Sequence, residues 1–430
     1  MRDSPVATRA AWFITLSVAL YVVAGAFSDE KLSFLYKNEL HYSASEVSTL
    51  GLLVGIPAYL RLFVGAGVDI FTLFGYHRRS YYMLSWLLSA ISMAMLALPA
   101  TYSPPLVIAS AFVSAAGGNL FYVIMDAVMV HVGNETGTIG RLQSIQQGVG
   151  FVLGLTFIGP LSGYVTQHWP NQLCFGASAL CAILGIAITN LIDERRVVVR
   201  TNSAEEIASR WRAVAAIRGA VSSPTLWILI GYIFFLIFTP GSATAQFYYS
   251  VDVLHLSKQT IGNLRIPSSI GVVAGIVVFG AVSRWIAVWW IIWIAFITDC
   301  LACTVGFWLV DVPTAYIVSL VGGFFGSLYN LSLLTIAARA CRPPVEAAMY
   351  GLMIGVIILA GAVSERLGSA IYDALGPPHH HTLTYAFHAV LWIGLITTLP
   401  AVLLIPFLPS WTRSRDPLQR PTEAQAANKP

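Results

Sequence analysis

Charged side chains are scarce in this sequence. Its 430 residues include 24 basic and 20 acidic ones, which together make up 10%, whereas 57% of the residues are hydrophobic. Soluble domains carry about a quarter charged residues, because a surface that faces water needs ionised groups over all of it. The composition therefore excludes a water-soluble fold of this size. The basic residues form no dense run, so we expect no nucleic-acid partner.

Cysteines and the common catalytic motifs are also lacking. The five cysteines lie in or beside apolar stretches, which argues against a disulfide framework and against an exposed zinc site. The sequence has no GxxxxGKS or GxxxxGKT loop to hold a nucleotide, no HExxH pair to hold a catalytic zinc ion and no GxSxG serine. We therefore expect no cofactor, no metal site and no enzyme active site. A membrane-embedded enzyme is the least favoured alternative.

Long apolar runs are what the sequence does have. A helix needs about 20 mainly apolar residues to cross a bilayer, and lipid offers the backbone of a spanning segment no hydrogen-bond partners outside a helix. The sequence therefore predicts an all-α membrane protein with twelve transmembrane helices. The predicted spans are 10–35, 46–67, 80–100, 105–131, 141–165, 171–192, 224–249, 259–283, 285–310, 313–338, 344–368 and 383–408.

A weak internal repeat divides the predicted spans into two sets of six. The sequence LHYS at 40–43 recurs as LHLS at 254–257, an offset of half the chain. Two six-helix halves with a long connector are typical of the major facilitator fold, whose halves rock around a site near the middle of the membrane. We expect an N-terminal half at 1–192, a cytoplasmic linker with an amphipathic helix at 193–223, a C-terminal half at 224–408 and a disordered cytoplasmic tail at 409–430.

The basic residues predict the orientation of the chain in its membrane. If the N-terminus is inside, 18 of the 24 basic residues fall on cytoplasmic segments, as the positive charge of short cytoplasmic loops requires. We therefore expect a multi-pass protein of the cell (inner) membrane with both termini in the cytoplasm. The lipid bilayer is its expected surrounding, and we expect a monomer.

A loop motif connects the chain with a known family. Between the second and third predicted spans, Arg61 stands eight residues before Asp69, and the basic pair Arg78-Arg79 follows Gly75. Asp69 ends a helix at the cytoplasmic surface, and Gly75 turns the chain so that the two arginines lie at the interface. This arrangement resembles the loop motif of major facilitators, and the sequence GYHRRSYY that ends it is similar to the folate-biopterin transporter family.

Further stretches extend the resemblance over both halves. Residues 125–130 and 140–144 are similar to the family's aspartate motif in the fourth span and to the start of its fifth span, and residues 346–351 are similar to its glutamate-alanine stretch. The chain departs from the family at Arg61-Leu62, where Lys-Pro is common. The resemblance implies a secondary active transporter that moves a folate or a pterin by alternating access. The alternative is a major facilitator carrier for another organic solute, such as a metabolite, a siderophore or a drug.

Polar residues inside the predicted spans are costly and are therefore candidates for function. Counting the helix rise places Asp299 and Asn119 near the middle of the membrane, with Tyr122 one turn from Asn119 on the same helix face. Arg265 has no acidic residue in its own apolar run and must find a partner on another helix or in a ligand. We expect these four residues and Asn330 to bind a small-molecule substrate, and the arginine suits an anionic one. For Asn330 a contact between helices is the alternative.

A second set of ionisable residues is assigned to gating or proton coupling. Arg61 lies at a depth close to that of Asp126, so the two either pair to hold their helices together or take part in binding substrate or a proton. Asp299 either stays protonated or exchanges a proton during transport. The residues assigned to proton coupling or gating, with a proton as the coupling ion, are Asp126, Arg61, Asp69, Arg78, Arg79 and Asp29.

Overall fold

The chain divides into two compact units. The computed structural model describes residues 5–71, 73–76, 78–136, 142, 145–146, 148–150, 153, 158–192, 224–238, 241–282, 285–340, 346–376 and 382–408. Unit 1 comprises Met1–Arg200 together with Leu256–Ile266, and unit 2 comprises Thr201–His255 together with Pro267–Pro430. The predicted linker at 193–223 and the predicted tail at 409–430 lie outside the described residues.

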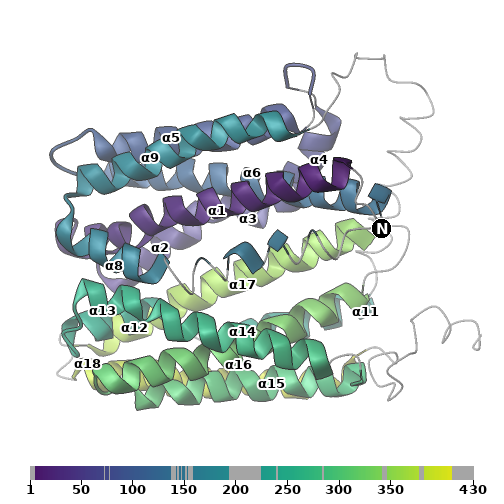
Figure 1. Cartoon of the computed structure of the whole chain (residues 1–430). Helices are drawn as coiled ribbons and strands as arrows, with labels where there is room; N and C mark the ends of the chain where they lie inside the picture. Colours follow the sequence, from purple (N-terminus) through teal and green to yellow (C-terminus); the bar gives the residue numbers. More distant parts are fainter. Residues whose placement is uncertain are drawn as a thin grey trace, which may run out of the picture. The chain divides into compact units, whose positions relative to one another are not determined.

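Unit 1 is built from four long helices and several short ones. Figure 1 shows two of the long helices, α5 and α9, side by side. The long helices are α1 (Pro5–Phe34), α5 (Arg79–Ala97), α6 (Pro104–Thr136) and α9 (Asn171–Ile188). The short ones are η1 (Leu35–Glu39), α2 (Ala44–Val54), α3 (Ile56–Tyr59), α4 (Arg61–Ile70), α8 (Gly159–His168), η3 (Thr189–Leu191) and α13 (Lys258–Asn263).

Unit 2 is also helical throughout its described residues. Its longest helices, α16 and α17, have 29 and 30 residues. The helices are α11 (Pro224–Ile237), α12 (Ala243–Asp252), α14 (Arg265–Val282), α15 (Val288–Val305), η4 (Gly306–Trp308), α16 (Val312–Ala340), α17 (Glu346–Leu375), α18 (Leu383–Leu404) and η6 (Ile405–Phe407). The first two residues of α14 belong to unit 1, and the remainder belongs to unit 2.

Nine helices in the described part of the chain are long and apolar enough to cross a bilayer. They coincide with nine of the twelve predicted spans. The predicted span 46–67 is broken into α2, α3 and α4, and the predicted span 224–249 is broken into α11 and α12. Most of the predicted span 141–165 lies outside the described residues. The hydropathy of the sequence thus located these helices. It gave no sign of the breaks in the span 46–67, whereas Pro240-Gly241 in the sequence predicted a break in the span 224–249.

The repeated LHxS sequence has the same local structure at both places. His41 and His255 both have a positive φ, of 53° and 50°, which is uncommon for residues other than glycine. The serine two residues later caps the next helix: the Ser43 hydroxyl accepts the backbone N–H of Glu46 at the start of α2, and that of Ser257 accepts Thr260 N–H at the start of α13. The repeat therefore encodes a turn followed by an N-cap.

Large side chains fill the interior of each unit. In unit 1 the core contains a group of aromatic rings, among them Tyr82 and Trp86, which are 0% and 1% exposed. Tyr21 stacks on Phe121 with ring centroids 4.5 Å apart. In unit 2 the core is mainly aliphatic and includes Tyr232, whose hydroxyl donates to the carbonyl oxygen of Ile292. Tyr21 and Trp86 of this aromatic core also line the candidate site.

Candidate substrate site

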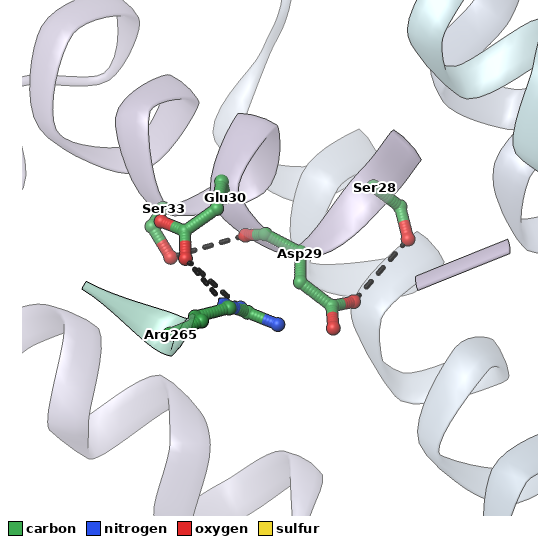
Figure 2. A network of polar contacts seen from close by, with 5 residues as sticks. All are labelled: Ser28, Asp29, Glu30, Ser33 and Arg265. Carbon is green, nitrogen blue, oxygen red and sulfur yellow. Dashed lines mark hydrogen bonds and ion pairs between the residues drawn. The ribbon is translucent and has the colours of Figure 1, made fainter. Parts of the chain in front are cut away.

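Four consecutive polar residues interrupt the apolar helix α1. They are Ser28, Asp29, Glu30 and Lys31. Successive residues of a helix are about 100° apart around its axis, so neighbouring side chains point in different directions. Figure 2 shows the Glu30 carboxylate joined to Arg265 and the Asp29 carboxylate joined instead to Ser28. Each of the three charged residues therefore serves a different contact.

Glu30 forms an ion pair with Arg265, the first residue of α14. Nε and Nη2 of Arg265 lie 3.0 Å and 2.9 Å from Oε1 of Glu30. The Glu30 side chain is 11% exposed and that of Arg265 is 38% exposed. The glutamate is thus shielded by the helices around it, while part of the guanidinium stays accessible. Arg265 finds its partner on another helix, one of the two outcomes that the sequence allowed.

Asp29 faces a cavity in unit 1. The cavity has a volume of about 320 Å³, and its lining includes Asp29, Arg265, Tyr21, Tyr122 and Trp86. The Asp29 side chain is exposed, and the Ser28 hydroxyl donates to its Oδ1 over 3.3 Å. The cavity combines charged groups with flat aromatic walls. It therefore offers both orientation and stacking to a small organic ring.

Two tyrosines form one side of this cavity. Tyr122 on α6 is 42% exposed, and its ring meets that of Tyr21 edge to face at 5.4 Å. Ser89 and Ser178 also line the cavity. Tyr122 was predicted to bind substrate, and it is placed in the cavity together with Arg265 and Asp29. Tyr21 was not predicted, because a tyrosine in an apolar helix gives no signal of its own.

Asn119 forms a hydrogen bond to the backbone of α3. Its side-chain amide donates to the carbonyl oxygen of Pro57 over 2.8 Å, and the residue is 8% exposed. Pro57 lies in α3, where the second predicted span is interrupted. Asn119 therefore binds a backbone group near a helix break, and the cavity lining takes Tyr122 but not Asn119 from this face of α6.

Arg61 and Asp126 are brought together in unit 1. Nη2 of Arg61 donates to Oδ2 of Asp126, and the amide of Gln146 donates to Oδ1 of the same carboxylate over 3.3 Å. The side chains of Arg61 and Asp126 are 25% and 45% exposed. This pair links α4 with α6. Asp69, the acidic residue of the predicted loop motif, lies in α4, but its side chain is outside the described residues.

The two arginines of the loop motif differ in their contacts. Nη2 of Arg79 donates to Oδ1 of Asn190 over 2.8 Å, and its guanidinium lies 5.6 Å from the ring centroid of Tyr76. Arg78 stands immediately before α5 and is half-buried. Arg79 thus links the start of α5 to η3, which follows α9 in unit 1.

Two predicted residues lie in unit 2. Asp299 on α15 is 7% exposed, and the Thr398 hydroxyl of α18 donates to its Oδ2 over 3.2 Å. Asn330 on α16 has an exposed side chain. Neither residue belongs to the cavity of unit 1. Among the described residues, no group of three or more His, Cys, Asp or Glu side chains is close enough to hold a metal ion.

Lys31 is a structural residue that the sequence did not reveal. The residue is 6% exposed, and its ammonium group donates to the carbonyl oxygens of Thr166 and Trp169 over 3.1 Å and 2.6 Å. These carbonyls lie at the C-terminal end of α8, where the helix leaves them without intrahelical partners. A cation also interacts favourably with that end of a helix. Lys31 therefore fastens α8 to α1.

Removing the ammonium of Lys31 is expected to destabilise unit 1. We expect Lys31→Met to lower the free energy of unfolding by about 1–3 kcal/mol, because carbonyl groups buried without a donor keep their desolvation cost. Thermal unfolding of the purified protein in detergent measures this change. Lys258→Met, at a half-buried position in α13 where the ammonium lies 5.0 Å from the ring centroid of Phe34, is the control and should shift the midpoint by less than half as much. Equal shifts for the two variants would contradict the assigned role of Lys31.

Glu365 is a second residue that the sequence did not reveal. Its Oε1 accepts the backbone N–H of Thr244 over 2.5 Å, and the N–H of Gly241 donates to the carbonyl oxygen of Ser364 over 2.9 Å. Thr244 lies in the first turn of α12, whose N–H groups have no intrahelical acceptors. A glutamate of α17 thus caps α12, which begins at Ala243. The signal in the sequence was Pro240-Gly241, which marks the break but not its partner.

Loss of this cap is expected to weaken unit 2. Glu365→Ala should lower the free energy of unfolding by about 0.5–2 kcal/mol, which is the usual cost of removing an N-cap acceptor. Glu365→Gln keeps an oxygen acceptor and should lose less than half of that amount. Chemical unfolding of the two variants, followed by the fluorescence of the protein, makes the comparison. If glutamine proved as destabilising as alanine, the hydrogen bond to Thr244 would not be the source of the stability.

Solved structures with a similar fold are membrane transporters. The nucleoside transporter NupG matches with a TM-score of 0.68 at 11% sequence identity, covering 93% of this chain and 99% of that one. A POT family transporter in complex with 5-aminolevulinic acid matches with a TM-score of 0.69 at 12% identity, covering 93% and 96%. A D-xylose-proton symporter gives 0.64 at 14% identity, covering 95% and 99%. This likeness shows that the chain shares the fold of these proteins, the major facilitator fold, and its apolar helices are those of a multi-pass membrane protein.

The sequence places the chain in a family. Residues 23–419 match the BT1 family, and the chain belongs to it. A folate-biopterin transporter of Synechocystis sp. is 27% identical over 416 residues, which are 92% of this chain and 81% of that protein. Folate transporter 1 of Plasmodium falciparum is 21% identical over 238 residues, which are 55% of this chain and 46% of that protein. The predicted family, fold and transporter class are thereby confirmed, and the relatives are transporters rather than enzymes.

Proposed function

We propose that this transporter carries a folate or a pterin across the membrane, with the cavity of unit 1 as part of its substrate site. The cavity is the observation that supports this most strongly. It holds a carboxylate, a guanidinium and two tyrosine rings, which suit a flat heterocycle with polar edges. The relatives whose names include folate or biopterin supply the substrate class.

The proposed mechanism is alternating access in a monomer of the cell membrane, with both termini in the cytoplasm. Substrate would enter from one side and leave to the other as the helices around the site rearrange. Arg61, Asp126, Asp69, Arg78 and Arg79 would form the cytoplasmic gate. The pair of Arg61 and Asp126 is suited to this role because it links two helices through a contact that is only partly buried.

Proton coupling is part of the proposal. Transporters of similar fold include a D-xylose-proton symporter and proton dependent oligopeptide transporters. In this chain Asp29 and Asp299 are carboxyl groups inside apolar helices, where ionisable residues are costly and commonly serve transport. The proposal assigns proton binding to one or both of them. Asn119 and Asn330 would contribute to substrate binding only in another state of the cycle.

Uptake by cells tests the proposed substrate class. Cells that make the protein should accumulate labelled folate or labelled pterin faster than cells with an empty vector, and Arg265→Ala should remove the difference. Thermal shift of the purified protein with a panel of other organic solutes tests the alternative, since a ligand that binds only the folded state raises its stability. Stabilisation by an unrelated solute, together with no uptake of folate or pterin, would overturn the proposal.

A further inference from the structure

We infer that the cavity of unit 1 binds the fused ring of the substrate through a pair of hydrogen-bond donors on the ring edge, with Asp29 as the acceptor, and that it excludes substrate carboxylates. The inference rests on the proposed function, because it names the part of a folate or pterin that this cavity takes. It also changes the expectation that an arginine here selects an anionic group.

The charges around the cavity favour a substrate group that donates hydrogen bonds over a substrate carboxylate. Arg265 already bonds Glu30 through Nε and Nη2. Asp29 forms no ion pair within the described part of the chain, and its one side-chain hydrogen bond there is the 3.3 Å contact from Ser28. Figure 2 shows the guanidinium joined to Glu30 and not to Asp29. Two carboxylates and one guanidinium leave one negative charge in excess, and a substrate carboxylate would be repelled by it.

The size and walls of the cavity favour a ring rather than a whole folate. Its volume of about 320 Å³ is near the lower end of the range of roughly 300–1,000 Å³ for ligand sites. The rings of Tyr21 and Tyr122 lie against each other at its side, and Trp86 also contributes to the lining. Flat aromatic side chains pack well on a flat heterocycle. An extended glutamate tail would have to lie outside this cavity.

The chemistry of a carboxylate matches one edge of a pterin. A 2-amino-4-oxopteridine presents a ring N–H and an adjacent amino N–H on the same edge. An ionised carboxylate is acceptor-only and has two oxygens, so it can accept both hydrogen bonds at once. In lumazine, which is 2,4-dioxopteridine, an oxygen replaces the amino group. That oxygen is a hydrogen-bond acceptor, as are the carboxylate oxygens of Asp29, so the two groups would repel each other.

Competition experiments on the transporter test this inference. Uptake of labelled pterin is measured with three unlabelled competitors: pterin, lumazine and p-aminobenzoylglutamate, which carries the tail of folate without its ring. We expect lumazine to compete at least about tenfold more weakly than pterin, since a hydrogen bond to a charged group contributes roughly 1.5–3 kcal/mol. The p-aminobenzoylglutamate should not compete. Equal competition by pterin and lumazine, or competition by the tail compound, would overturn the inference.

A variant and a binding measurement complete the test. Asp29→Asn should weaken competition by pterin at least about tenfold and make pterin and lumazine nearly equal competitors. Asp311→Asn, the same change at an exposed position outside the cavity, should keep the ratio of the two competitors. If the asparagine variant does not fold, the selectivity of the natural protein decides alone.

If no labelled pterin or folate is taken up, the proposed function fails. Thermal shift with pterin and with lumazine then decides the inference, and equal shifts, including no shift with either, would overturn it.

Discussion

Replacing Arg265 by alanine is expected to abolish transport and to destabilise the protein. The substitution leaves Glu30, whose side chain is 11% exposed, without its guanidinium partner. Breaking a buried ion pair from one side costs about 3–5 kcal/mol, and the partial exposure of Arg265 reduces this to about 2 kcal/mol. We also expect uptake of labelled folate or pterin to fall at least about tenfold, because the cavity loses its positive charge. Uptake assays and thermal unfolding measure the two effects separately.

A double variant separates the structural effect from the functional one. Arg265→Gln with Glu30→Gln removes both charges together and should recover most of the lost stability, since no buried charge stays unpaired. Transport should not recover, because the guanidinium is still absent from the cavity lining. Recovery of transport in the double variant would show that Arg265 serves only to neutralise Glu30. A stable and fully active Arg265→Ala would contradict the assigned pair altogether.

Enlarging Gly262 is expected to force α13 away from α8. A Cβ atom at Gly262 would lie 2.6 Å from the backbone of Gly163 and 2.7 Å from the carbonyl oxygen of Gly159. These contacts are closer than real Cβ atoms show, and the neighbours are backbone atoms that cannot turn aside. Gly262→Leu should therefore cost about 3 kcal/mol of stability. Because Arg265 follows α13 directly, the same displacement should draw it from Glu30 and reduce transport.

A matched glycine provides the control for this prediction. Gly280 on α14 is exposed, and nothing lies within 4 Å of a Cβ atom built there. Gly280→Leu should leave uptake unchanged and should not lower the unfolding temperature, since glycine itself is a poor helix former. A loss of stability as large in Gly280→Leu as in Gly262→Leu would mean that helix contact is not the cause.

Much of the fold follows from elementary properties of the sequence. Apolar runs in lipid must be helical, so hydropathy alone located the helices that the described residues contain. The pairing of Arg61 with Asp126 was among the expected outcomes, because two opposite charges at similar depth lower each other's cost. Arg265 was expected to need a partner on another helix for the same reason, and Glu30 provides it.

Other features could not be predicted, because they depend on which helices meet. Lys31 binds carbonyls 135 and 138 residues away, and Glu365 caps a helix 121 residues before it. Neither contact leaves a local pattern in the sequence. Tyr21 and Trp86 were likewise missed as cavity residues, since a ring that lines a site looks like any core aromatic. The expected preference for an anion was based on Arg265 alone, whereas Asp29 and Glu30 lie beside it, and the competition experiment decides between an anionic group and a hydrogen-bond donor.

Counterflow in vesicles tests the central claim, that this protein is a folate or pterin transporter whose substrate site includes the cavity of unit 1. Vesicles that contain the purified protein are loaded with unlabelled pterin or folate and diluted into a trace of the labelled compound, so that no assumption about the coupling ion is needed. We expect a transient accumulation of label above that of protein-free vesicles, lost in Arg265→Ala and reduced in Asp29→Asn. Label no higher than in protein-free vesicles, for both compounds, would contradict the central claim.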